Sequence, residues 1–149
     1  MANTYGVANP LPLPVIATLA GGADVALPAG VQTTIASATI AGLDPSGFYF
    51  PEVIVQIGVL NGAAAPTAFQ YGAKIGAGSN FDFFNVAAAL LVNNATLYLV
   101  VHLIGGPSQA PWQGGGSVVN LNALATTNAA TAKFAGSRAV FRLWRAPDQ

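Results

Sequence analysis

Cysteine is absent from this chain of 149 residues, so neither disulfides nor thiolate metal sites can form. Charge is nearly as scarce. The sequence has five Lys and Arg and five Asp and Glu, whereas an average soluble domain of this length carries about 37 charged residues. Binding of nucleic acid needs clustered basic side chains. The basic residues are too few for an arm that packages a genome, and we expect no nucleic-acid partner.

The shortage of charge also bears on solubility. A folded monomer of 15.0 kDa exposes on the order of 7,000 Å² of surface. Each charged residue would then serve roughly 700 Å², which exceeds the largest apolar patch of a typical monomer, about 300–600 Å². The composition therefore predicts a protein whose surface is largely covered by other protein, as in a component of an assembly.

Residues that carry chemistry are few. The single histidine, His102, lies in an apolar segment, which favours a hydrogen-bonded, half-buried side chain over a catalytic one, and no Gly-x-Ser-x-Gly motif accompanies it. Asp24, Asp44, Glu52 and Asp82 are isolated in the sequence and form no metal-binding motif. We predict no catalytic residue, no metal site and no cofactor, and hence no enzyme.

Long hydrophobic runs are also missing. The longest, Val86–Val92 and Leu97–Ile104, fall far short of the roughly 20 residues of a membrane-spanning helix. The segment Met1–Tyr5 has neither a basic region nor a long apolar core, so we expect no secretory signal. The sequence predicts no contact with a membrane.

Proline shapes the first residues of the chain. Pro10, Pro12 and Pro14 stand at every second position, and proline fixes φ and lacks an N–H, so this segment forms neither a helix nor a central strand. We expect an extended arm over residues 1–14, followed by one domain over residues 15–149. The arm is either a stiff lead into the first strand or a segment that lies on a neighbouring subunit.

The remainder reads as short strands separated by Gly, Pro, Asn and Asp. We expect strands over residues 15–20, 25–27, 31–40, 48–50, 52–60, 69–74, 80–84, 96–104, 117–121 and 139–145. Pro51 is expected to break the fourth from the fifth. Residues 86–92 suit a strand or a helical turn, and residues 122–132 suit a loop or a short helix. The pattern predicts an all-β fold, a jelly-roll-like β-sandwich of about eight antiparallel strands with a Pro-rich N-terminal arm.

Two tryptophans are candidates for contact with a partner. Trp112 lies in a Gly-rich loop over residues 105–117, where it either packs on its own domain, anchors in a partner's pocket or stacks on a sugar. Arg142 and Arg145 flank Trp144 and either pair with a partner's carboxylates or are solvated on an edge strand. The predicted partner contacts are Pro10, Leu11, Pro12, Leu13, Trp112, Trp144 and Arg145.

The chain resembles the small jelly-roll decoration, or cement, proteins of tailed-phage heads. The features that carry the likeness are the Pro-rich arm at Asn9–Pro14, the Thr- and Ala-rich strand at Val31–Ile40, the pair Glu52–Leu60 and Thr96–Ile104, the Gly-rich loop and the lack of cysteine. The resemblance implies a dimer or trimer on the outside of an assembled capsid, where it clamps neighbouring major-capsid subunits. Because charges are few here, such contacts would rest on apolar burial and on backbone and amide hydrogen bonds.

Two other functions fit the same composition. One is a receptor- or carbohydrate-binding jelly roll, such as a fibre head or lectin-like domain, with Trp112, Gln113 and Tyr71 around a shallow site. The other is a coat subunit that forms the shell itself. In shells that package nucleic acid, that role usually comes with a basic arm, which this sequence lacks.

Overall fold

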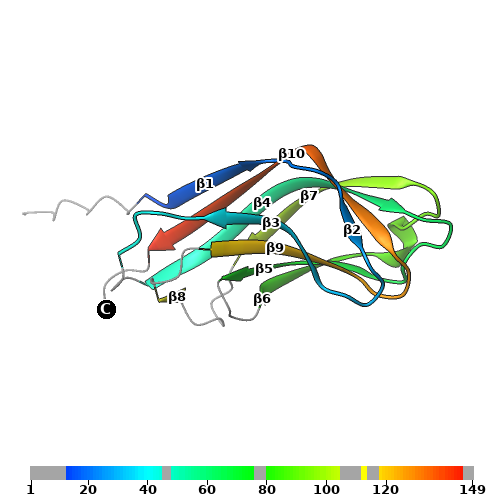
Figure 1. Ribbon diagram of the computed structural model, residues 1–149. Helices are drawn as coiled ribbons and strands as arrows, with labels where there is room; N and C mark the ends of the chain where they lie inside the picture. The colour runs from blue at the N-terminus through cyan, green and yellow to red at the C-terminus, as the bar shows by residue number, and fades with distance from the viewer. Residues whose placement is uncertain (1–12, 45–47, 76–79, 105–111, 114–117, 146–149) are drawn as a thin grey trace, which may run out of the picture.

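Two antiparallel β-sheets pack face to face in the computed structural model (Figure 1). The structure describes residues 13–44, 48–75, 80–104, 112–113 and 118–145. Sheet A has the order β1 (Val15–Ala20), β10 (Ala130–Arg145), β4 (Phe48–Asn61), β7 (Thr96–Ile104). Sheet B has the order β3 (Thr33–Thr39), β9 (Val118–Ala125), β5 (Phe69–Ile75), β6 (Asn80–Val86).

Two short strands extend sheet A. Strand β2 (Val25–Leu27) pairs with the first residues of β10, and β1 pairs with its last residues, so β1 and β2 share one side of that long strand. Strand β8 (Trp112–Gln113) pairs with the first residues of β4, and β7 pairs with the later residues of β4.

The strand pairing has a simple rule that identifies the fold. If the two short strands are set aside, eight strands remain in chain order: β1, β3, β4, β5, β6, β7, β9 and β10. The first of them pairs with the last (β1 with β10), the second with the seventh (β3 with β9), the third with the sixth (β4 with β7) and the fourth with the fifth (β5 with β6). This is one long antiparallel hairpin rolled into two four-stranded sheets, the jelly roll. The predicted fold class is confirmed.

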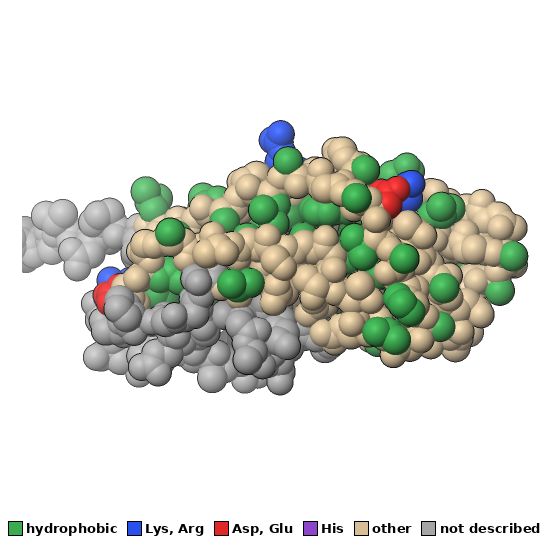
Figure 2. All heavy atoms as spheres, viewed as in Figure 1, with side chains coloured by type: hydrophobic (Ala, Val, Ile, Leu, Met, Phe, Trp, Pro, Cys, Tyr) green, Lys and Arg blue, Asp and Glu red, His purple; other side chains and the backbone are tan. Residues whose placement is uncertain are grey.

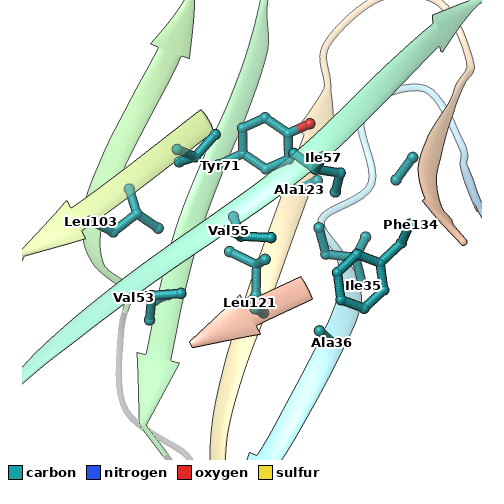
Figure 3. Close-up of a cluster of buried hydrophobic side chains, with 14 of the residues drawn as sticks. Ile35, Ala36, Val53, Val55, Ile57, Tyr71, Leu103, Leu121, Ala123 and Phe134 are labelled. Carbon is teal, nitrogen blue, oxygen red and sulfur yellow. The ribbon is translucent and has the colours of Figure 1, made fainter. Parts of the chain in front are cut away.

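The hydrophobic core lies between the sheets. Alternate residues of β4, including Val53, Val55 and Ile57, are fully buried and face sheet B, as the pleat of a strand requires. Figure 3 shows them opposite Tyr71 of β5 and Leu121 of β9, with further core side chains from β3. The β-branched side chains of one sheet thus pack on aromatic and aliphatic side chains of the other.

Most predicted strands are present, and the differences are local; Trp112–Gln113, inside the predicted loop 105–117, forms strand β8. Pro51 lies inside the continuous strand β4 instead of breaking it. Of the segment 86–92, Ala88–Leu90 forms a single 3-10 turn, η1. The strand predicted over 117–121 runs on to Ala125, and residues 130–132 already belong to β10. Residues 122–132 are therefore mostly strand, and the prediction of a loop or a short helix there was wrong.

Among the described residues, β4 has no partner on one side at Pro51. Strand β7 is described up to Ile104, opposite Glu52, and β8 is described from Trp112, opposite Tyr49. A proline without an N–H fits such a position. The arm predicted over residues 1–14 lies outside the described residues, apart from Leu13 and Pro14.

Candidate interaction surface

The surface of sheet A that faces away from the core carries an unusual amount of apolar side chain. In β7, burial alternates strictly at first, with Leu97 and Leu99 turned inward and Tyr98 and Val100 turned outward. Among the described side chains of sheet A, five large apolar ones are substantially exposed: Ile16 (54%), Tyr98 (69%), Val100 (68%), Ile104 (53%) and Trp144 (42%). We call this surface the outer face of sheet A. Large exposed apolar patches are typical of interaction sites, so this face is the candidate surface.

A polar cluster centred on Glu52 interrupts that face. Oε2 of Glu52 accepts a hydrogen bond of 2.9 Å from Nε1 of Trp144 and lies 3.4 Å from Nη1 of Arg142. Its Oε1 lies 2.7 Å from Nε2 of His102. The three partners come from β10 and β7, the neighbours of β4 on either side. The cluster therefore ties three adjacent strands together through one carboxylate.

The surroundings of Glu52 favour its ionised form. Burial opposes ionisation, but the hydrogen bonds from Trp144 and His102 and the nearby charge of Arg142 outweigh it and hold the pKa of Glu52 below its usual value. The side chain of Glu52 is largely buried, whereas that of His102 is half exposed. His102 is hydrogen-bonded and half exposed, as the sequence predicted, but it lies on the outer face and not in the core.

Other charges are also paired within the chain. Lys133 forms an ion pair with Asp24, and Nη2 of Arg145 lies 3.2 Å from Oδ2 of Asp44. The hydrogen bond from Lys133 lowers the pKa of Asp24 and raises that of Lys133 itself. In Figure 2 the few red and blue side chains on the visible side stand among green and tan ones; red lies beside blue at the left and the right, whereas the blue at the top has no red next to it. Arg138 of β10 differs, because it is exposed and has no ion pair among the described residues.

The predicted contact residues differ in where the structure places them. Trp144 lies on the outer face of sheet A, and Leu13 is almost fully exposed next to β1. Arg142 and Arg145 pair with Glu52 and Asp44 of their own chain, on a strand that is central in its sheet and not at an edge. The backbone of Trp112 pairs with Tyr49, but its side chain and residues Pro10, Leu11 and Pro12 lie outside what the structure describes.

The residues that contribute most to this face were not among the contacts predicted from the sequence. Tyr98, Val100 and Ile104 belong to a run that is apolar at nearly every position, which reads as a strand buried on both sides. The sequence does contain one indication of the outward side of this strand, because its two polar residues, Thr96 and His102, are separated by an even number of positions. Both polar residues share the outward parity of Tyr98 and Val100.

The structure weakens the carbohydrate-binding alternative. Tyr71, one of three residues proposed around a shallow sugar site, is fully buried in the core beside Phe69. Among the described residues, no three His, Asp or Glu side chains lie close enough to hold a metal ion. In the same part of the chain, no helix is long and apolar enough to cross a membrane.

Comparison with known proteins gives a likeness to solved structures alone. No protein-family model and no curated protein matches the sequence. Among solved structures, the T=1 particles derived from infectious bursal virus match at 15% identity over 89% of this chain and 36% of theirs, with a TM-score of 0.47. The T13 particle of infectious bursal disease virus matches at 14% identity over 91% of this chain and 36% of its own, with a TM-score of 0.48.

A third match, the Gx strain of the same virus, has 12% identity over 91% of this chain and 37% of its own, with a TM-score of 0.44. The chain spans little more than a third of the length of these matched chains. Its jelly-roll fold is established by the strand pairing described above.

Proposed function

We propose that the protein is a structural component of a virus particle, a decoration or cement protein that binds the outside of an assembled capsid and clamps neighbouring major-capsid subunits. The observation that carries the proposal is the outer face of sheet A, with five large apolar side chains between 42% and 69% exposed. The chain would act in the virion, on the outer surface of the shell.

Apolar burial provides the driving force for such binding. Covering exposed apolar surface contributes roughly 25 cal/mol per Å², and a standard interface buries about 800 Å² on each partner. The outer face of sheet A spans four strands about 4.8 Å apart, each contributing about seven residues at about 3.3 Å per residue, so its flat footprint is roughly 450 Å². Side chains that stand on the sheet raise the accessible area well above the footprint.

The fold and the charge favour this class of function over others. Jelly rolls serve as capsid subunits, lectins and cupins. A cupin-type metal site needs a cluster of histidines, and the chain has one histidine. A subunit that lines the inside of a shell faces the genome, where basic residues are useful, and here five Lys and Arg are matched by five Asp and Glu. An external position suits a neutral protein better.

Mass photometry tests the proposal directly. The purified chain is mixed with empty shells assembled from the major capsid protein encoded in the same genome. Saturable addition of mass to preformed shells supports a decoration protein. Closed shells formed by the chain alone identify a coat subunit instead. Glycan-array binding without any binding to shells identifies a receptor-binding module.

A matched pair of variants tests the surface. Ile16→Asp places a charge on the outer face of sheet A, whereas Val31→Asp places one at a similarly exposed residue, 51% against 54%, in the turn before β3. We expect Ile16→Asp to weaken shell binding at least tenfold and Val31→Asp to leave it within threefold. Equal effects of the two variants on shell binding would show that the outer face of sheet A is not the contact surface.

A further inference from the structure

Strand β7 forms one edge of sheet A. Within the described residues it pairs with β4 along its whole length and has no partner strand on its other side. A strand at a sheet edge presents unpaired N–H and C=O groups, which readily pair with another chain. Strand β7 therefore offers a ladder of up to eight residues, Thr96–Leu103, for strand addition.

Proteins usually protect such edges, and β7 lacks the common protections. Its residues include no proline and no Lys, Arg, Asp or Glu, and its ladder with β4 runs without a register shift. The ladders of the other edges are irregular or short. That of β3 shifts between Thr34 and Ala36, and that of β6 shifts at Ala73 and Lys74. Strand β1 has six residues and follows Pro14.

We propose that β7 pairs antiparallel with β7 of a second copy of this chain, about a two-fold axis, so that sheet A continues from one subunit into the next. A second copy is the occupant that the strand itself favours, because two uncharged edges meet without repulsion. Pairing the seven residues Leu97–Leu103, which are symmetric about Val100, supplies about six to eight backbone hydrogen bonds, within the range of 10 ± 5 direct hydrogen bonds of a typical protein interface.

The alternation of side chains restricts the register. Full overlap of two β7 strands places Val100 opposite Val100 of the second copy, and Tyr98 opposite His102 of the second copy. All of these side chains point outward in their own subunit, so the pairing keeps the outer face of sheet A continuous across the axis. Val100 and Tyr98 are both about two-thirds exposed in the isolated chain. In the dimer, Val100 would be partly covered by Val100 of the second copy, and Tyr98 by His102 of the second copy.

This inference goes beyond the proposed function and does not depend on it. Self-association through the β7 edge can be measured with the purified chain in the absence of any shell. If the chain binds shells, a dimer joined at β7 would present two outer faces on one continuous surface, and its binding would gain from multivalency.

A single introduced cysteine tests the contact, because the wild-type chain has none. In Val100→Cys, two thiols would face each other across the axis at the separation of a cross-strand pair, which a disulfide can bridge. Under mild oxidation, we expect a covalent dimer on non-reducing gels. Ile16→Cys, a similarly exposed residue on the opposite edge strand of sheet A, is the control and should remain largely monomeric on the same gel.

Val100→Lys provides the complementary measurement, because lysine is a common protection of natural sheet edges. We expect the wild-type chain to sediment as a dimer and Val100→Lys as a monomer with unchanged circular dichroism. Val31→Lys, which is exposed away from the edge, should remain dimeric. A wild-type chain that is monomeric at high micromolar concentration, a dimeric Val100→Lys, or equal crosslinking by Ile16→Cys and Val100→Cys would overturn the proposal.

Discussion

The indole Nε1 of Trp144 donates a hydrogen bond of 2.9 Å to Oε2 of Glu52, across the paired strands β10 and β4. A residue that the sequence predicted as a partner contact is thus held by its own chain. The bond fixes the indole on the outer face of sheet A while leaving 42% of Trp144 exposed. A large aromatic side chain that is held in place loses little further freedom when a partner covers it, which favours tight binding.

Replacing Glu52 should expose the role of this carboxylate in stability. Glu52→Gln removes the negative charge of the carboxylate whose oxygens accept hydrogen bonds from Trp144, His102 and Arg142. Hydrogen bonds to charged groups contribute about 1.5–3 kcal/mol, and we expect the free energy of unfolding at pH 7 to fall by about 2 kcal/mol. Urea denaturation measures the difference.

The same variant predicts a pH dependence. The pKa of Glu52 is lower in the folded chain than its usual value of 4.5, so its contribution is fully present above the unfolded pKa and is lost as the pH falls through the folded pKa. The stability difference between wild type and Glu52→Gln should therefore shrink below about pH 4.5. Parallel stability curves from pH 7 to pH 3 would contradict this account.

Substitution by alanine should change the free energy of unfolding very differently at two adjacent glycines. A Cβ on Gly21 would lie 1.9 Å from the carbonyl oxygen of Phe134, whereas one on Gly22 would meet nothing within 4 Å. The backbone N–H of Gly21 also donates to the carbonyl of Ser137 at 2.6 Å, at the end of β1. Gly21→Ala should lower the free energy of unfolding by about 2–3 kcal/mol, and Gly22→Ala should change it by less than about 0.5 kcal/mol. Chemical denaturation of both variants checks this, and similar stabilities would refute the close approach.

Two buried tyrosines should respond in opposite directions to phenylalanine. The hydroxyl of Tyr71 is buried without a hydrogen-bond partner among the described residues, and burial raises its pKa. The hydroxyl of Tyr49 accepts a hydrogen bond of 2.9 Å from the backbone N–H of Asp44. Tyr71→Phe should stabilise the chain by about 1 kcal/mol and Tyr49→Phe should destabilise it by about 0.5–1.5 kcal/mol. Thermal unfolding measures both, and a loss of stability in Tyr71→Phe would reveal a polar partner for that hydroxyl.

Salt should have little effect on the proposed β7 dimer. Strand β7 has no Lys, Arg, Asp or Glu, so its association gains little from ion pairs that salt would screen. Raising the salt concentration from about 0.1 M to 1 M shortens the Debye length from about 10 Å to about 3 Å. The dissociation constant should change by less than threefold in sedimentation equilibrium. A tenfold weakening would show that the few charges near the edge contribute to the contact.

The sequence was informative where side chains prefer one backbone conformation. The runs around Val53–Val59 and Thr96–Ile104 are rich in β-branched residues, and both are strands. The segment 122–132 was misread because Ala, Thr and Asn have weak preferences. In the structure, Ala123, Ala125, Ala130 and Ala132 face the core, where the opposing sheet leaves room for small side chains. Tertiary packing decided that segment.

The candidate surface was harder to predict than the fold. The composition indicated that apolar area is exposed somewhere, but the position of that area depends on which face of each strand turns outward. For β7 that choice is set by pairing with β4, a strand more than 30 residues earlier in the chain. The Glu52 cluster likewise joins residues 50, 90 and 92 positions apart. No local pattern marks such contacts.

The nested pairing of the strands has a consequence for folding. The hairpin of β5 and β6 closes over a short stretch of chain, whereas the pairing of β1 with β10 joins residues as distant as Val15 and Leu143. Closing a longer loop costs more chain entropy, and folds dominated by distant contacts fold slowly. Strand β1 cannot take its place until β10 has been synthesised, so sheet A is completed last. Until then, the apolar strands of sheet A can pair with strands of other chains.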